Sequence, residues 1–166
     1  MRAVFALLAS LAVILTVAVT SVSAIDRPQT FSLLEIDESE VAINGFDFQR
    51  QPRPGDGFGF ISGLYKWAGT KRGARVGHDE GLCTFLRVPT TEQNFSASAH
   101  CTASFFLPVG TVLVEAFVHF TDGPGNFDVA VIGGTGAYAN ARGFVHIRDI
   151  GAQDSGHSNI DFHLLP

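Results

Sequence analysis

Apolar and polar residues alternate with a period of two over most of the chain after residue 25, and clusters of Gly, Pro, Asn and Asp separate the alternating segments. A period of two places successive side chains on opposite faces of a β-strand. Helical periodicity is almost absent over the same range. The pattern therefore predicts an all-β protein, with strands at 30–36, 41–47, 58–67, 73–78, 82–88, 95–106, 111–120, 127–132, 143–149 and 158–164.

Two of these expected strands indicate how the sheet closes. Along 95–106, one face carries Phe and small apolar residues and the other carries Ser, His and Thr, so one face is expected to be buried. Along 111–120, apolar residues occur on both faces, which suits either a sandwich or a barrel whose outside packs on something else. The 18 glycines would allow the bends that a closed barrel needs.

The amino terminus has the pattern of a secretory signal peptide. Arg2 is followed by an uncharged apolar run, and the small residues around Val22 and Ala24 resemble a signal-peptidase site. We therefore expect cleavage after Ala24, residues 25–166 as a single domain, and a secreted product that is not held at a membrane. An uncleaved membrane anchor is the alternative interpretation.

Charge and motifs exclude several function classes. The full chain has a formal net charge of −5, and the expected cleavage removes one further positive charge, that of Arg2. An acidic protein is a poor partner for nucleic acid. The chain shows no phosphate-binding loop, no dinucleotide fingerprint and no zinc-like spacing of its six histidines. The sequence thus predicts no nucleic acid partner, no cofactor and no metal site.

The two cysteines are placed to face each other in a hairpin. If 82–88 pairs with 95–106, the midpoint between Cys83 and Cys101 falls at Glu92, inside a polar stretch suited to a turn. Pairs of cysteines in secreted proteins are commonly bonded. We expect a Cys83–Cys101 disulfide, with a buried reduced pair as the alternative.

The segment 131–143, VIGGTGAYANARG, resembles the glycine-rich signature of dirigent proteins and their bacterial relatives. A longer and sparser similarity to allene oxide cyclases runs from Gly55 through this segment. The resemblance implies a closed, antiparallel eight-stranded barrel that encloses an apolar pocket and assembles as a homotrimer. Within the signature, four glycines are expected to form a structural turn and to permit positive φ: Gly133, Gly134, Gly136 and Gly143.

The same resemblance suggests site residues. Glu35 matches a glutamate on the first strand of the cyclases, and Asp37 has a carboxylate where the cyclases have an amide. Cys83 falls where the cyclases also have a cysteine. Val118 lies near the position of a pocket tyrosine, and Arg142 matches the arginine of the dirigent signature. The resemblance therefore implies Glu35 and Arg142 as catalytic residues, and Asp37, Cys83 and Val118 as ligand contacts.

A second acid–base pair follows from periodicity alone. Glu115 and His119 are four residues apart on one expected strand and so share a face. They would form a catalytic wall if that face pointed into the barrel. The resemblance places Val118 inside instead, which would turn both residues outward.

Three functions remain open at this point. The first is an isomerase that binds a small apolar reactive intermediate and steers its cyclisation. The second is a dirigent-type or carrier protein that holds a hydrophobic or phenolic ligand without chemistry of its own. The third is a structural barrel filled by its own Phe side chains. An interior cavity of on the order of 300 Å³ or more would favour the first two.

Overall fold

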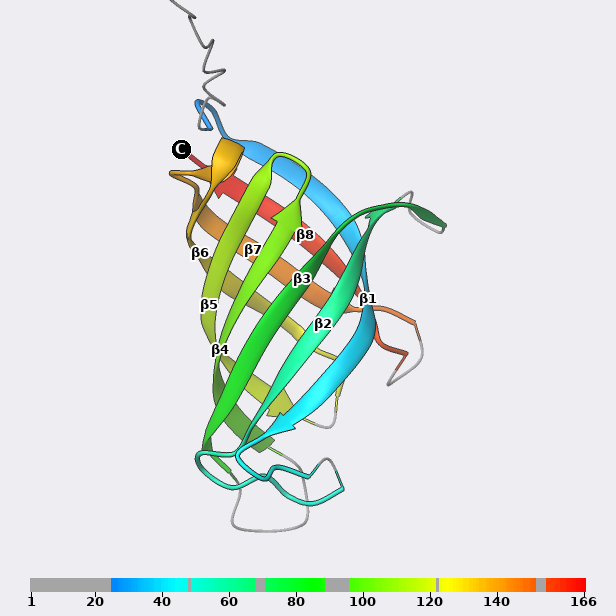
Figure 1. The fold of residues 1–166 in the computed structure, drawn as a ribbon, viewed down its shortest axis with the longest axis vertical. Helices are drawn as coiled ribbons and strands as arrows, with labels where there is room; N and C mark the ends of the chain where they lie inside the picture. The colour runs from blue at the N-terminus through cyan, green and yellow to red at the C-terminus, as the bar shows by residue number, and fades with distance from the viewer. Residues whose placement is uncertain (1–24, 48, 68–70, 89–95, 122, 152–154) are drawn as a thin grey trace, which may run out of the picture.

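The protein folds as a closed antiparallel barrel of eight strands (Figure 1). The computed structural model describes residues 25–47, 49–67, 71–88, 96–121, 123–151 and 155–166. The predicted signal peptide, 1–24, lies outside the described residues. Each strand pairs with its neighbours in sequence, and the eighth pairs with the first. The elements are β1 (Gln29–Ile43), β2 (Gly57–Trp67), β3 (Arg72–Arg87), β4 (Ser96–Leu107), β5 (Gly110–Thr121), β6 (Asn126–Gly134), η1 (Gly136–Tyr138), β7 (Arg142–Asp149) and β8 (His157–Leu165).

The barrel confirms the predicted fold class, but two strand boundaries were wrong. Strand β1 joins the expected strands 30–36 and 41–47, and β3 joins 73–78 and 82–88. In β1, a register irregularity between Asp37 and Ser39 lets the polar segment stay paired to β2. In β3, residues 78–81 pair with both β2 and β4. Polar segments with the composition of a turn are therefore strand interiors here.

One end of the barrel is filled by apolar side chains. This packed end lies at the top of Figure 1, beside η1 and the carboxyl terminus. Phe162 is fully buried there, with its ring stacked on Phe31 at 4.5 Å and edge-to-face with Phe105 at 5.1 Å between centroids. Such contacts stabilise a core beyond the area that they bury. The same core contains Leu33, Leu64, Val112, Val145, Ile160 and Leu164.

The glycine-rich turn closes this packed end. Gly136 has φ +59 and begins η1, and positive φ is also found at Gly133 and Gly143. Gly134 does not have positive φ, which corrects our expectation for that residue. A Cβ on Gly134 would instead overlap the backbone carbonyl oxygens of Thr111 and Tyr138. Glycine is required at this position because the chain passes so close to its neighbours.

The predicted disulfide is present. Cys83 on β3 lies directly opposite Cys101 on β4, with the Cα atoms 4.1 Å apart and the sulfur atoms bonded. Around it, Phe85, Ala97 and Ala99 form a second buried apolar cluster, distinct from the core of the packed end. The disulfide therefore belongs to the other half of the barrel.

Candidate functional site: a cavity inside the barrel

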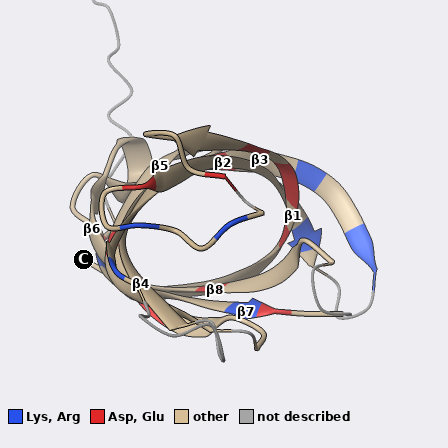
Figure 2. Cartoon of the chain, turned by 90° about the horizontal axis from the view of Figure 1, so that it is seen from below, with Lys and Arg blue, Asp and Glu red and all other residues tan. Residues whose placement is uncertain are grey.

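The half of the barrel away from the packed end contains a cavity of about 430 Å³. All eight strands contribute to its wall, and it reaches the β5–β6 loop at Gly123 and Gly125. Figure 2 looks along the barrel from this end and shows the strands closing into a ring. A volume of this size lies in the range of small-molecule sites. The apolar part of the wall includes Val114, Val118, Val129 and the rings of Phe58, Phe60, Phe105, Phe120 and Phe127.

The inward-facing side chains change from apolar to polar at one level of the barrel. On adjacent strands, Leu33 of β1 is in register with Ile160 of β8, and both belong to the packed end. Two residues further along β1, Glu35 is in register with Ser158 of β8, and both line the cavity. Strand β7 makes the same change, from Ile147 to Asp149. Because alternate residues of a strand share a face, these positions form a polar band on β1, β7 and β8.

Glu35 of this band forms a buried carboxyl pair with Asp79. The residues are 8% and 1% exposed, respectively, and their carboxyl groups lie close enough to share a hydrogen bond. Two carboxyl groups form such a bond only when one of them carries a proton. Without that proton, both oxygens of Asp79 lack a hydrogen-bond donor among the described residues. A proton shared with Glu35 gives Asp79 the hydrogen bond that it otherwise lacks.

Burial shifts the acidity of both groups. Removal from water raises the pKa of Glu35 well above its ordinary value, and the neighbouring Asp79 raises it further. Burial also raises the pKa of Asp79, to about 7. A carboxyl group that keeps its proton near neutral pH can act as a proton donor, and its partner can act as a base.

Further carboxylates surround the pair. Asp37 accepts a hydrogen bond of 3.2 Å from the hydroxyl of the buried Ser62. Burial raises the pKa of Asp37, and the charge of Asp149 adds to this shift. Glu40 also lines the cavity, and burial raises its pKa as well. One part of the wall is therefore acidic, and burial raises the pKa of several of its members.

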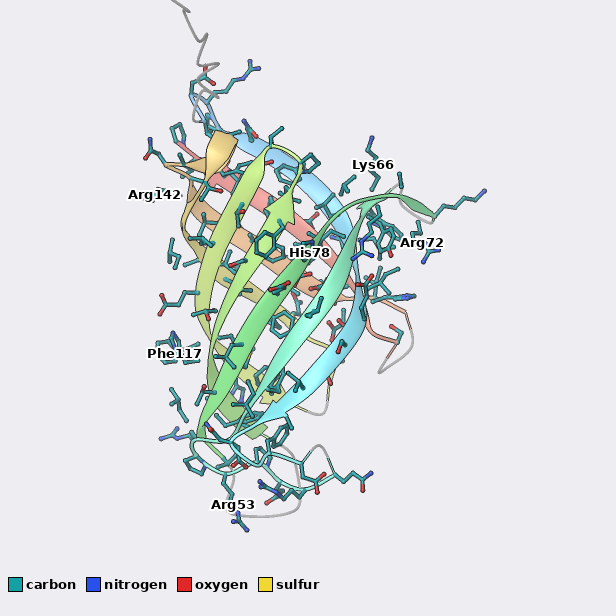
Figure 3. All side chains as sticks on the ribbon, in the orientation of Figure 1. Arg53, Lys66, Arg72, His78, Phe117 and Arg142 are labelled. Carbon is teal, nitrogen blue, oxygen red and sulfur yellow. A yellow bond between two sulfur atoms is a disulfide. The ribbon has the colours of Figure 1, made fainter. Side chains whose placement is uncertain are left out.

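Four of the five predicted site residues line the cavity: Glu35, Asp37, Cys83 and Val118. Arg142 does not. Figure 3 shows it at the opposite end of the barrel, beside the glycine-rich turn. Its side chain is exposed and donates hydrogen bonds to the backbone oxygens of Asn140 and Ala141, at 3.3 and 3.1 Å. The match to the signature placed Arg142 in the correct turn, but that turn is remote from the cavity, and we remove it from the candidate site.

Glu115 and His119 are turned outward, as the resemblance predicts by placing Val118 inside the barrel. Glu115 lies 2.6 Å from His100 on the outer face. His119 contributes to the rim of the cavity, but its ring hydrogen-bonds the hydroxyl groups of Ser96 and Ser98, each at 3.2 Å. These partners lie on the polar face of β4, so the pair does not form a catalytic wall inside the barrel.

Sequence reasoning missed Asp79. The expected strands 73–78 and 82–88 leave Asp79, Glu80 and Gly81 as a break between them. Had the period of two been continued from Cys83 through Gly81, Asp79 would have fallen on the same inward face. The continued alternation of the strand was therefore the signal that could have identified Asp79 as an inward-facing residue.

The described part of the chain has no group of three or more His, Cys, Asp or Glu residues arranged to hold a metal ion. Within the same residues, no helix has the length and apolarity to cross a membrane.

The barrel is similar to solved structures of proteins with different activities. Against a pyocyanin demethylase, the TM-score is 0.64 at 24% identity, covering 82% of this chain and all of that one. Against an exo-specific intermolecular Diels-Alderase, it is 0.60 at 14% identity, covering 82% and 97%. Against a pterocarpan synthase dirigent protein, it is 0.55 at 16% identity, covering 84% and 94%. No family model and no curated protein matches the sequence. At these identities the similarity shows a shared barrel fold; the narrower likeness to allene oxide cyclases stays a prediction.

Proposed function

We propose that the barrel binds a small, largely apolar reactive molecule in its cavity and steers the cyclisation of that molecule. The observation that carries this proposal is the proton-bearing pair of Glu35 and Asp79 in the wall of a cavity of about 430 Å³. The structural similarity to a Diels-Alderase and to a dirigent protein supports the proposal at the level of the fold.

The chemistry would depend first on shape. A wall of Phe and Val side chains holds a flexible molecule in one folded conformer and keeps water from its reactive atoms. As the ring closes, one heteroatom of the molecule gains negative charge. The proton held between Glu35 and Asp79 moves toward that atom, and the pair takes a proton back when the product forms. The reaction is an isomerisation, so no atoms are gained or lost.

A dirigent-type carrier is the second candidate, because most of the cavity wall is apolar. In that case shape alone would set the product, and the carboxyl pair would contribute little. The third possibility, a barrel filled by its own Phe side chains, is disfavoured because these rings line a cavity that is large enough for a ligand.

We also propose that the protein is secreted after cleavage at Ala24 and assembles as a homotrimer. A disulfide suits an oxidising compartment. Exposed apolar residues on the outside of the barrel, among them Phe106, Phe117 and Ile132, suit a subunit contact. Amino-terminal sequencing of the secreted protein and sedimentation equilibrium test these two points.

The test of the function compares product ratios with and without the protein. Suitable substrates are a freshly prepared allene oxide, a phenoxy radical and an intramolecular diene with its dienophile. The wild-type protein should shift the ratio of stereoisomers for at least one of them. Glu35→Gln keeps the shape but removes the acid, so it should lower the rate by about 100-fold or more if the pair acts as a proton donor. For a carrier, the variant should keep the wild-type bias.

Glu80→Gln is the matched control, because Glu80 lies next to Asp79 on β3 but is exposed on the outer face. It should behave as the wild type. If every product ratio stays at its spontaneous value, and the uncharged aromatic probe acridine does not bind, the proposed function is wrong.

A further inference from the structure

The cavity wall has a strong asymmetry of charge. Five acidic residues line it: Glu35, Asp37, Glu40, Asp79 and Asp149. Among the described residues, no Lys or Arg lines it, and His119 reaches only the rim. A wall that contains acids without matching bases favours ligands of positive charge.

The arginines nearest in the chain to this end do not neutralise the wall. Arg87 at the end of β3 and Arg148 beside Asp149 on β7 are exposed and do not line the cavity, and the other two belong to the loop between β1 and β2. Arg50 is held by Asp56 at 2.8 Å and by the backbone oxygen of Gly45 at 2.7 Å. Arg53 is exposed, and Figure 3 shows it at the outer tip of this end of the barrel.

Asp79 gives an independent indication of a ligand. It is 1% exposed and lines the cavity, and neither of its oxygens has a donor among the described residues when Glu35 is ionised. A buried ionised carboxylate is strongly unfavourable unless a donor or a positive charge faces it. No cationic side chain lines the described cavity wall. When Asp79 is ionised, a positive charge on a ligand would supply the partner that the described wall does not.

Aromatic rings complete the environment that a cation prefers. Phe58 lies 6.3 Å from Phe60 and 6.0 Å from Phe120 between ring centroids, and all three line the cavity. The faces of such rings attract cations, most strongly where water is excluded. Flat apolar molecules also pack well against them. The cavity thus combines a surface for a ring system with a place for a positive charge.

We propose that the natural ligand carries a cationic nitrogen, as a protonated amine or an N-alkylated heteroaromatic ring, and that this charge lies against the carboxyl pair of Glu35 and Asp79. This proposal rests on the proposed function, because it names the substrate class of the same cavity. It goes beyond the proposed function because it assigns the carboxyl pair a role in binding a positively charged group of the ligand.

The proposal predicts that ligand binding changes the protonation of the carboxyl pair. Below about pH 7 Asp79 holds a proton of its own, and a cation in contact with the pair favours loss of that proton, while Glu35 keeps the proton that it donates. Glu38, in an ion pair of 3.0 Å with Arg75, adds negative charge near Asp79. The other groups that face the pair are Asp37 on the same strand, Ser62 on β2, Phe105 on β4, Asp149 on β7 and Ser158 on β8, with His157 beside Asp37. Only His157 among them can carry positive charge. Binding of the cation should therefore release a proton and become tighter as the pH rises through about 7, the pKa of Asp79.

The experiment compares two probes of nearly the same shape, N-methylacridinium and acridine, at about pH 8, where acridine is uncharged. Fluorescence titration gives both affinities, and calorimetry in buffers of different ionisation enthalpy gives the number of protons released. At about pH 8 the wild-type protein should bind the cation about tenfold or more tightly than acridine, and calorimetry with N-methylacridinium at about pH 6, below the pKa of Asp79, should show release of a proton. In Asp79→Asn and Glu35→Gln this preference should fall about tenfold, while affinity for acridine is kept. Glu80→Gln should keep the full preference.

The outcomes separate the two proposals. Equal affinity for both probes, or a preference that survives in both Asp79→Asn and Glu35→Gln, would overturn the cationic ligand and leave the cavity as a site for neutral molecules. Failure of both probes to bind would overturn the cationic ligand and count against a ligand cavity altogether. If Asp79→Asn does not fold, as judged by circular dichroism, Glu35→Gln alone decides.

Discussion

The two ends of this barrel are built from the same strands but are filled differently. At the packed end, β1 and β8 direct Phe31, Leu33 and Phe162 inward, where these side chains pack into the apolar core. Toward the other end, the same two strands direct Glu35 and Ser158 inward, around a cavity of about 430 Å³. The change occurs within two residues on each strand. Stability and ligand binding are therefore separated along the barrel axis, while the backbone is continuous.

The packed end should dominate stability. Phe162→Ala removes a fully buried ring and should lower the free energy of unfolding by about 3–5 kcal/mol. Phe120 lines the cavity and is only half-buried, so Phe120→Ala should cost about 1–2 kcal/mol. Urea denaturation of the two variants measures both values. Similar losses for the two would show that the barrel is not divided in this way.

The disulfide should be the strongest single stabilising feature of the cavity half. Reduction of the Cys83–Cys101 bond, which joins residues 18 apart, should lower the free energy of unfolding by roughly 3 kcal/mol. Non-reducing and reducing mass spectra should differ by the mass of two hydrogen atoms, and the reduced protein should melt at a lower temperature. Two thiols that react with an alkylating reagent in the native, unreduced protein would contradict this.

The carboxyl pair should make the cavity half sensitive to pH. Asp79 has a pKa of about 7 in the folded protein, above that of an unfolded aspartate, so the folded state binds the extra proton. Stability from this group is fully present below the unfolded pKa of about 4 and is lost as the pH rises toward the folded value. Between pH 5 and pH 8, the wild-type protein should lose about 2–3 kcal/mol that Asp79→Asn does not lose. Thermal unfolding at a series of pH values measures this difference, and parallel curves for the two proteins would contradict it.

The glycine-rich turn offers the smallest and most local contrast. Gly134→Ala places a Cβ against backbone oxygens at the packed end and should cost about 1–3 kcal/mol without changing the affinity for acridine. At Gly133 a Cβ meets nothing within 4 Å, so Gly133→Ala should cost only the strain of its positive φ, about 1 kcal/mol. Chemical denaturation and acridine titration of both variants provide the test. A selective loss of acridine binding in Gly134→Ala would make the turn part of the site.

The alternation of apolar and polar residues was enough to predict an all-β protein, and the resemblance to known barrels added closure and the number of strands. Strand boundaries were wrong where polar residues lie inside a strand, as at residues 37–40 and 79–81, because composition does not distinguish a turn from a polar stretch that is paired within the sheet. The position of Cys83 opposite Cys101 was predictable because it depends on the register of a single hairpin.

The carboxyl pair was not predictable in the same way. Glu35 was identified by resemblance, but its contact with Asp79 links β1 to β3 across β2. Such a contact depends on the stagger of strands in a closed barrel, which no local pattern specifies. Arg142 illustrates the converse: its motif was identified correctly, yet its distance from the cavity follows from which end of the barrel the turn closes.

The central claim is that the cavity half binds a small molecule and the packed half does not. Nuclear magnetic resonance of protein with labelled valine methyl groups, titrated with acridine at about pH 8, tests it most directly. The account predicts shifts at Val114 and Val118, which line the cavity, and unchanged signals from Val112 and Val145 in the packed end. Unchanged signals from Val114 and Val118 at saturating acridine, or shifts confined to Val112 and Val145, would contradict it.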